Sequence, residues 1–150
     1  MRIFDGPEAL EEAVGTQIGS SDWLLIEQDR IQKFADATGD YQWIHVDVER
    51  ARSGPFGATI AHGYLSLSLL PALAAQIYRV GGFTMTMNYG LNKVRFPEPV
   101  IVGSRVRSSL RLMSLQAVAQ GYQLTLQHTL ECEGSKKPAV VAEQIRLLVV

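Results

Sequence analysis

Two ionisable side chains near a predicted helix end are well suited to acid–base chemistry. Asp40 and His45 lie five positions apart, and Gly39 precedes them. On one continuous helix, at about 3.6 residues per turn, five residues would place the two side chains roughly 140° apart. Because Gly39 favours an end to the helix, the following loop can bring both side chains to one water molecule. Such a pair can act as a general acid and base. The alternative is that Asp40 and His45 only cap short helices.

Other residues of chemical interest are few. Cys132 is the single cysteine, so no intrachain disulfide can form, and a structural zinc site would lack soft ligands. No glycine-rich phosphate loop and no Gly-x-Ser-x-Gly turn occurs. We expect His62 to make a structural hydrogen bond to a loop, and His128 to be a hydrogen-bonded histidine of the core. The sequence therefore predicts neither a metal site nor a bound cofactor.

The composition narrows the class of protein. The chain has 150 residues, 47% apolar and 19% charged, with a formal net charge of −1. The apolar content excludes a wholly disordered chain, and the near-zero charge argues against a dedicated nucleic-acid binder. The length favours one domain over residues 1–150. Asp5 lies where a signal peptide requires an apolar run, and no stretch approaches the ~18 apolar residues of a membrane span. We expect a cytoplasmic protein without nucleic-acid or membrane partners.

Helices are predicted in the first half of the chain. Pro7 favours the start of a short helix over 8–14. Ile31, Phe34, Ala35 and Thr38 follow the spacing of an amphipathic helix, and a further short helix is expected over 47–52. The segment 62–78 is apolar on nearly every side, which predicts a helix buried all round. Pro71 lies in its interior and should remove one hydrogen bond and bend it.

Strands are predicted in the second half, where apolar and polar residues alternate with period two. One-faced alternation is typical of an antiparallel sheet with one side on the core. The expected core-facing rows are Val106, Ser108, Leu110 and Leu112; Tyr122, Leu124, Leu126, His128, Leu130 and Cys132; and Ala139, Val141, Ile145, Leu147 and Val149, with Glu143 an exception. An earlier strand begins near Phe83 and extends to Phe96, and 134–138 reads as a turn.

These elements predict an α+β architecture in which one long helix must be covered by one antiparallel sheet. A curved sheet wrapped around the helix, the hot-dog architecture, satisfies this requirement. A flat two-layer α+β sandwich fits the same pattern.

The segment around Asp40 resembles the signature of the MaoC-like dehydratases, the R-specific enoyl-CoA hydratases also called hydratase 2. The matching positions are Phe34, Thr38, Gly39, Asp40, Ile44, His45 and Ala51. Gln42-Trp43 replaces the usual Asn-Pro, a form that resembles the NodN-like branch of the family. Segments 60–65 and 88–103 also resemble the family, so the likeness extends from Trp23 onward.

The resemblance implies a site and a reaction in fatty acid metabolism. Asp40 and His45 would activate the water that adds to a trans-2-enoyl-CoA, giving (R)-3-hydroxyacyl-CoA. The backbone N–H of Gly63 would polarise the thioester carbonyl. Lys93 and Arg95 are candidates for the phosphates of CoA, and Asn88 for the acyl pocket. The implied reaction needs no metal and no cofactor, because CoA belongs to the substrate.

Two other functions suit the same fold. An acyl-CoA thioesterase is one, although hot-dog thioesterases typically lack the Gly-Asp…His loop. A non-catalytic subunit that binds acyl thioesters is the other. A wrapped sheet leaves edge strands exposed, and such edges are usually paired or covered. We therefore expect a homodimer.

Overall fold

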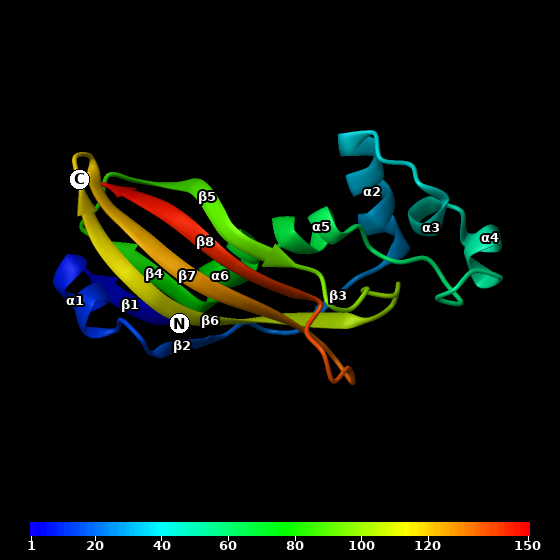
Figure 1. Cartoon of the computed structure of the whole chain (residues 1–150), viewed down its shortest axis with the longest axis horizontal. Coiled ribbons are helices and arrows are strands. Elements are labelled where there is room, and N and C mark those ends of the chain that lie inside the picture. Colours follow the sequence, from blue (N-terminus) through cyan, green and yellow to red (C-terminus); the bar gives the residue numbers. More distant parts are fainter.

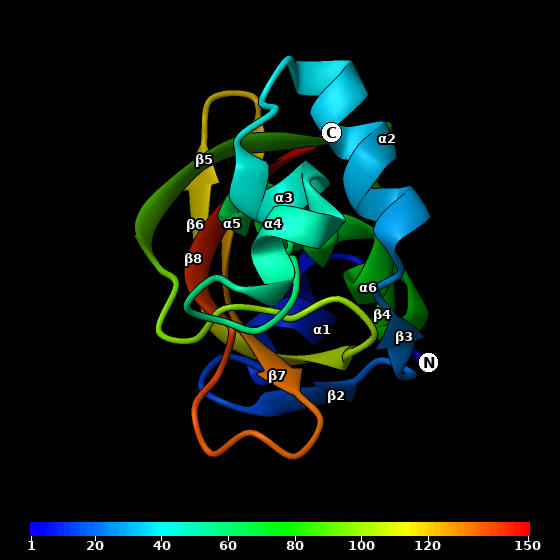
Figure 2. The same cartoon turned by 90° about the vertical axis from the view of Figure 1, so that its right-hand side faces the viewer.

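The computed structural model describes residues 1–150 and has the hot-dog architecture, in which a curved antiparallel sheet wraps around central helices (Figures 1 and 2). The main sheet has six strands in the order β2-β6-β7-β8-β5, and β3 also pairs with β6. These strands are β2 (Gln17–Ser20), β3 (Leu24–Leu25), β5 (Met85–Arg95), β6 (Arg105–Val118), β7 (Gly121–Cys132) and β8 (Val140–Val149). A second, parallel pair that the sequence pattern did not predict joins β1 (Arg2–Asp5) to β4 (Tyr78–Gly81).

The helix predicted over 62–78 is divided into α5 (Gly63–Ser68) and α6 (Leu70–Ile77). Pro71, which was expected to bend the interior of one helix, lies instead in the first turn of α6, where proline is well tolerated. The two helices lie within the curve of the sheet (Figure 2). The prediction that the helix is buried all round was wrong, because Tyr64, Ser68 and Ala75 are exposed. One side of α5 and α6 therefore faces away from the sheet.

Three short helices form a separate group beyond one end of the sheet (Figure 1). They are α2 (Gln28–Thr38), α3 (Trp43–Val46) and α4 (Val48–Arg52), while α1 (Pro7–Glu12) lies near the opposite end. Helix α2 ends as predicted at Gly39, whose φ of 78° is in the left-handed region that favours glycine. Asp47 caps the N-terminus of α4, and its carboxylate accepts a hydrogen bond from the Arg50 N–H.

The core-facing rows of β6 and β7 are confirmed, but the row predicted for β8 was wrong by one position. Val140, Ala142 and Gln144 pair with Leu130, His128 and Leu126 of β7, so the even-numbered residues of β8 share the inner face. Apolar residues occur on both faces of β8, and Gln144 and Arg146 are polar residues on the inner face. Alternation of polarity therefore misassigns this strand, and Glu143 is an ordinary outer residue.

The core contains two apolar clusters separated by polar side chains. One cluster includes Leu65 and Leu70 of the central helices, and the other includes Phe4, Leu126 and Leu148. Between the clusters, one polar residue from each of four neighbouring strands forms a hydrogen-bonded row, which we call the polar belt: Ser108, His128, Gln144 and Asn88. The first three members of this belt are buried. None of the helices is both long enough and apolar enough to pass through a membrane.

Candidate active site

The loop between α2 and α3 holds Asp40, and α3 holds His45. After Gly39 turns the chain, the Asp40 carboxylate accepts a hydrogen bond from the Gln42 N–H at 3.3 Å between Oδ1 and N. Asp40 is exposed, whereas only 6% of the His45 surface is accessible. The sequence did not predict α3 as a helix. Because α3 turns the chain after the loop, the His45 side chain comes close to that of Asp40, five positions earlier.

A backbone carbonyl sets the tautomer of the neutral His45 ring. His45 Nδ1 lies 2.7 Å from the Ile60 carbonyl oxygen. Because a carbonyl can only accept, Nδ1 carries the hydrogen and the neutral ring keeps an unprotonated Nε2. Burial lowers the pKa of His45, and the nearby His62 lowers it further, while the Ile60 hydrogen bond and Asp40 oppose this shift. The result is a neutral imidazole with one nitrogen free to accept a proton.

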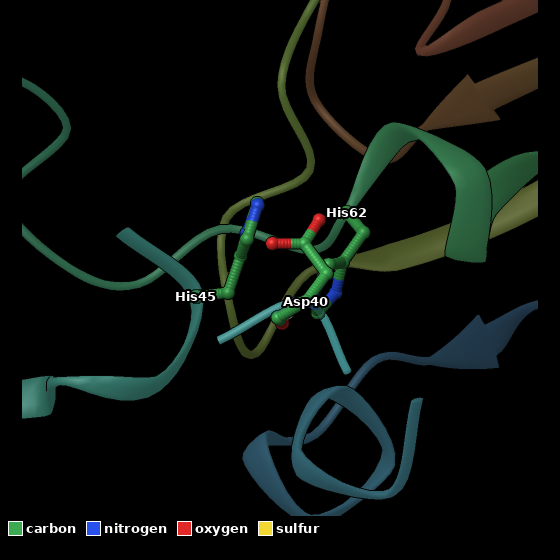
Figure 3. Close-up of side chains that lie close together, drawn as sticks. All are labelled: Asp40, His45 and His62. Atoms are coloured by element: carbon green, nitrogen blue, oxygen red, sulfur yellow. The ribbon is translucent and has the colours of Figure 1, made fainter. Parts of the chain in front are cut away.

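His62 joins the other two residues, and the three side chains converge in Figure 3. A ring nitrogen of each histidine and a carboxylate oxygen of Asp40 all lie within 4.8 Å of one another. The His62 ring stacks on His45 with centroids 3.8 Å apart, and its Nε2 lies 3.0 Å from the main-chain carbonyl oxygen of Asp40. The expected hydrogen bond from His62 to a loop is confirmed. Its stacking on His45 had no signal in the sequence.

These three residues are also the group that comes nearest to a metal site. His45 can offer Nε2, and Asp40 can offer its carboxylate. His62 Nε2 is occupied by the Asp40 carbonyl, and its Nδ1 is enclosed and has no hydrogen-bond partner. In this arrangement an ion entering from solvent would meet two ligands rather than three, so the donor set is a poor fit for a zinc ion.

A cavity of about 340 Å³ lies beside His45 and is lined largely by apolar residues. Gly63, the first residue of α5, lines the same cavity, together with Phe96 and Ala139. First-turn N–H groups have no acceptor within their own helix, and the Gly63 N–H makes no turn or cap hydrogen bond. An added Cβ at Gly63 would lie 3.3 Å from the Phe96 ring, closer than usual packing. Glycine therefore keeps this wall of the cavity open.

The remaining predicted residues, Asn88, Lys93 and Arg95, lie on β5, outside the segment that holds Asp40 and His45. Asn88 contacts Gln144 in the polar belt, with its Oδ1 accepting at 2.7 Å from Nε2. Asn88 also lines a second cavity, of about 260 Å³, that is distinct from the one at His45. Lys93 is exposed, and Arg95 is exposed with its guanidinium donating to the Val94 carbonyl. The structure thus brings Asp40, His45 and Gly63 to one region and leaves Asn88, Lys93 and Arg95 outside the cavity beside His45.

The acid–histidine loop on a hot-dog fold is an arrangement of dehydratases, and comparison with known proteins agrees with it. Residues 9–132 match the model of the MaoC like domain. The chain belongs to the MaoC-like dehydratase family.

Among its relatives, the chain is 55% identical over 146 residues to the 3-hydroxyacyl-thioester dehydratase Z of Mycobacterium tuberculosis, covering 97% of each chain. It is 44% identical over 138 residues to nodulation protein N of Rhizobium leguminosarum bv. viciae, covering 90% of this chain and 86% of the relative. The solved structure of R-hydratase PhaJ1 from Pseudomonas aeruginosa shares the fold, with a TM-score of 0.73 and 24% identity over 91% of this chain and 81% of that chain.

Proposed function

We propose that this protein is a hydro-lyase that interconverts a trans-2-enoyl-CoA and the (R)-3-hydroxyacyl-CoA by adding or removing water. The observation that carries the proposal is the convergence of Asp40 with a buried His45 whose free nitrogen is Nε2. A relative that is 55% identical is named a 3-hydroxyacyl-thioester dehydratase, which supports the same reaction class.

In the hydration direction His45 acts as the base. Its Nε2 takes one proton from a water molecule, whose second contact is the Asp40 carboxylate. The water oxygen bonds to C3, and the electron pair of the C2–C3 double bond moves into the thioester as an enolate. Returning one proton to C2 restores the starting protonation of the pair. Water addition is redox-neutral, so this chemistry requires neither a redox cofactor nor a metal.

The Gly63 N–H is the proposed donor to the thioester oxygen. Gly63 lines the same cavity as His45, and its N–H has no acceptor within α5. Negative charge develops on that oxygen as the enolate forms, and a single fixed donor at such a position contributes about 3–4 kcal/mol in known enzymes. The mostly apolar wall, which includes Phe96 and Val100, suits the hydrocarbon part of the substrate.

We further propose a homodimer that forms through strand β5. The sheet ends at this strand, which has 11 residues and one unpaired edge. Met85, Met87 and Tyr89 on this strand are exposed at 49%, 40% and 63%. An exposed apolar edge of this length offers unpaired backbone groups with which another chain can pair.

Turnover of crotonyl-CoA tests the reaction. Loss of the enoyl absorbance should be catalysed by the native protein, and Asp40→Asn and His45→Ala should each lower kcat/KM by at least about 100-fold. Asp36→Asn is the matched control, because Asp36 is an exposed acid on α2 outside the site. Its rate should equal the native rate.

The same assay separates the alternative functions. Thiol release from the CoA ester without loss of the double bond would assign the protein to thioesterases. Binding of enoyl-CoA without turnover at any chain length would assign it to non-catalytic subunits. Native activity in the Asp40→Asn variant would contradict the proposed pair.

A further inference from the structure

Arg146 is a charged residue on the inner face of the sheet. On the inner face of β8 it lies between Gln144 and Leu148, and its partner on the neighbouring strand β7 is the buried Leu124. Its Nη1 donates at 2.6 Å to the hydroxyl oxygen of Tyr78, a residue that is 3% exposed at the end of α6. An arginine on a core face normally has a carboxylate partner.

No such partner is present for Arg146. All four ion pairs of the protein involve other residues. The Arg146 Nε is buried and has no hydrogen-bond acceptor. Its charge affects two neighbouring residues. It lowers the pKa of Tyr78, which burial raises by more, and it lowers the pKa of His128, which burial lowers by more. The fold thus maintains a positive charge that nothing in the chain neutralises.

A small cavity lies at this charge. It has a volume of about 190 Å³, and Arg146, Arg79, Tyr78 and Thr86 supply its polar wall. Arg79 also has no ion-pair partner. Because the Tyr78 oxygen already accepts from Arg146, its own hydrogen remains available to donate, as does that of Thr86. The cavity therefore has two cations and two hydroxyl donors, with no acidic side chain among its lining residues.

We propose that this cavity binds the carboxylate or phosphate group of a small molecule. Guanidinium groups present planar pairs of N–H donors that match both oxyanions. One oxyanion would offset both arginine charges and accept from the hydroxyls of Tyr78 and Thr86. The cavity shares no residue with the one beside His45, so the proposal is independent of the proposed reaction.

Arginine side-chain NMR tests the site directly. The full-length protein is labelled with ¹⁵N at arginine Nε and titrated with inorganic phosphate or with succinate, at constant ionic strength set by chloride. The Nε–H signal of Arg146, assigned by its loss in Arg146→Lys, should shift and saturate with one of the two anions. The anion that binds more tightly shows whether the natural ligand carries a phosphate or a carboxylate group.

Arg79→Gln should weaken that binding by about tenfold or more, the loss typical of a hydrogen bond to a charged group. Arg79 is exposed, so this variant should fold even if Arg146→Lys does not. Arg111→Gln, which removes an exposed arginine of β6, is the matched control and should bind like the native protein. The proposal is overturned if neither anion produces a saturable shift, or if Arg79→Gln binds as tightly as Arg111→Gln. It is also overturned if the signal shifts only when the protein is diluted, because a carboxylate of a second copy then fills the cavity.

Discussion

His62 contacts both members of the proposed acid–base pair. Its ring stacks on His45, and its Nε2 holds the main chain of Asp40 at 3.0 Å. The ring also packs against Phe34, with centroids 4.9 Å apart. His62 also precedes Gly63, so one residue connects the Asp40 loop, the His45 ring and the start of α5. A change at His62 should therefore alter the site without removing either reacting group.

Two substitutions separate the contacts of His62. His62→Phe keeps an aromatic ring but removes the donor to the Asp40 carbonyl, so kcat should fall by about tenfold. His62→Gln keeps an N–H donor, so kcat should fall less. Both remove the histidine whose charge lowers the pKa of His45. The acidic limb of the kcat/KM profile, which the native protein should show below pH 6.5, should therefore move to higher pH.

Measured pH profiles of kcat and kcat/KM check this prediction, which rests on the proposed reaction. His45 must be neutral to accept a proton, so activity is lost as pH falls through its pKa. If His62 only supported the fold, its substitution would lower the amount of active protein and leave the acidic limb of the kcat/KM profile at the same pH. An unshifted limb in both variants would thus contradict the assigned role of His62.

At the residue scale the sequence predicted some contacts and missed others. Gly39 and the spacing of Asp40 and His45 predicted that the two side chains meet after a helix break, and they do. The stacking of His62 on His45 depends on how the α2–α3 loop packs against the start of α5. Residues 17 positions apart carry no periodic signal of such a contact.

At the scale of elements, the core-facing residues of a strand could be predicted where polar and apolar residues alternate. The prediction failed where they do not alternate. Strands β6 and β7 alternate cleanly, so their inner faces could be assigned. Strand β8 carries apolar residues on both faces, and its inner face includes Gln144 and Arg146 for reasons of hydrogen bonding. Helix α3 has only four residues, which is too short for a periodic pattern.

The polar belt across β6, β7, β8 and β5 should make stability depend on pH. His128 is fully buried, its Nε2 lies 3.0 Å from the Gln144 Oε1, and burial lowers its pKa from 6.5 to about 4. Between these values the unfolded chain binds a proton that the folded chain does not, so stability falls as pH falls. The His128 contribution to this loss should be about 2 kcal/mol between pH 7 and pH 4.5.

Urea unfolding at the two pH values checks this contribution. His128→Asn should lower stability at pH 7 but lose less between pH 7 and pH 4.5 than the native protein. Ser108→Ala is the matched control, because it removes another member of the polar belt and no titrating group. Equal pH dependence in His128→Asn and Ser108→Ala would show that His128 is not the titrating group.

At the scale of the whole molecule, exposed residues of α5 and α6 lie beside β5, because Ser68 and Tyr89 line one cavity and Ala75 and Thr86 line another. The sequence predicted exposed edges in general, but the choice of β5 follows from the strand order, which depends on contacts far apart in the chain. If β5 is the dimer edge, two lysines on it should separate the subunits, since charge on an edge strand opposes pairing.

The double variant Met87→Lys, Tyr89→Lys should therefore be a monomer by light scattering at concentrations where the native protein is a dimer. Met113→Lys is the matched control, because Met113 is exposed at 38% on β6, which β7 and β8 separate from β5. It should remain a dimer. Urea unfolding of the separated subunits would show how much stability the interface provides, and crotonyl-CoA turnover would show whether one subunit suffices for the reaction. A native protein that is monomeric at all concentrations, or a double variant that dimerises as well as Met113→Lys, would exclude β5 as the interface.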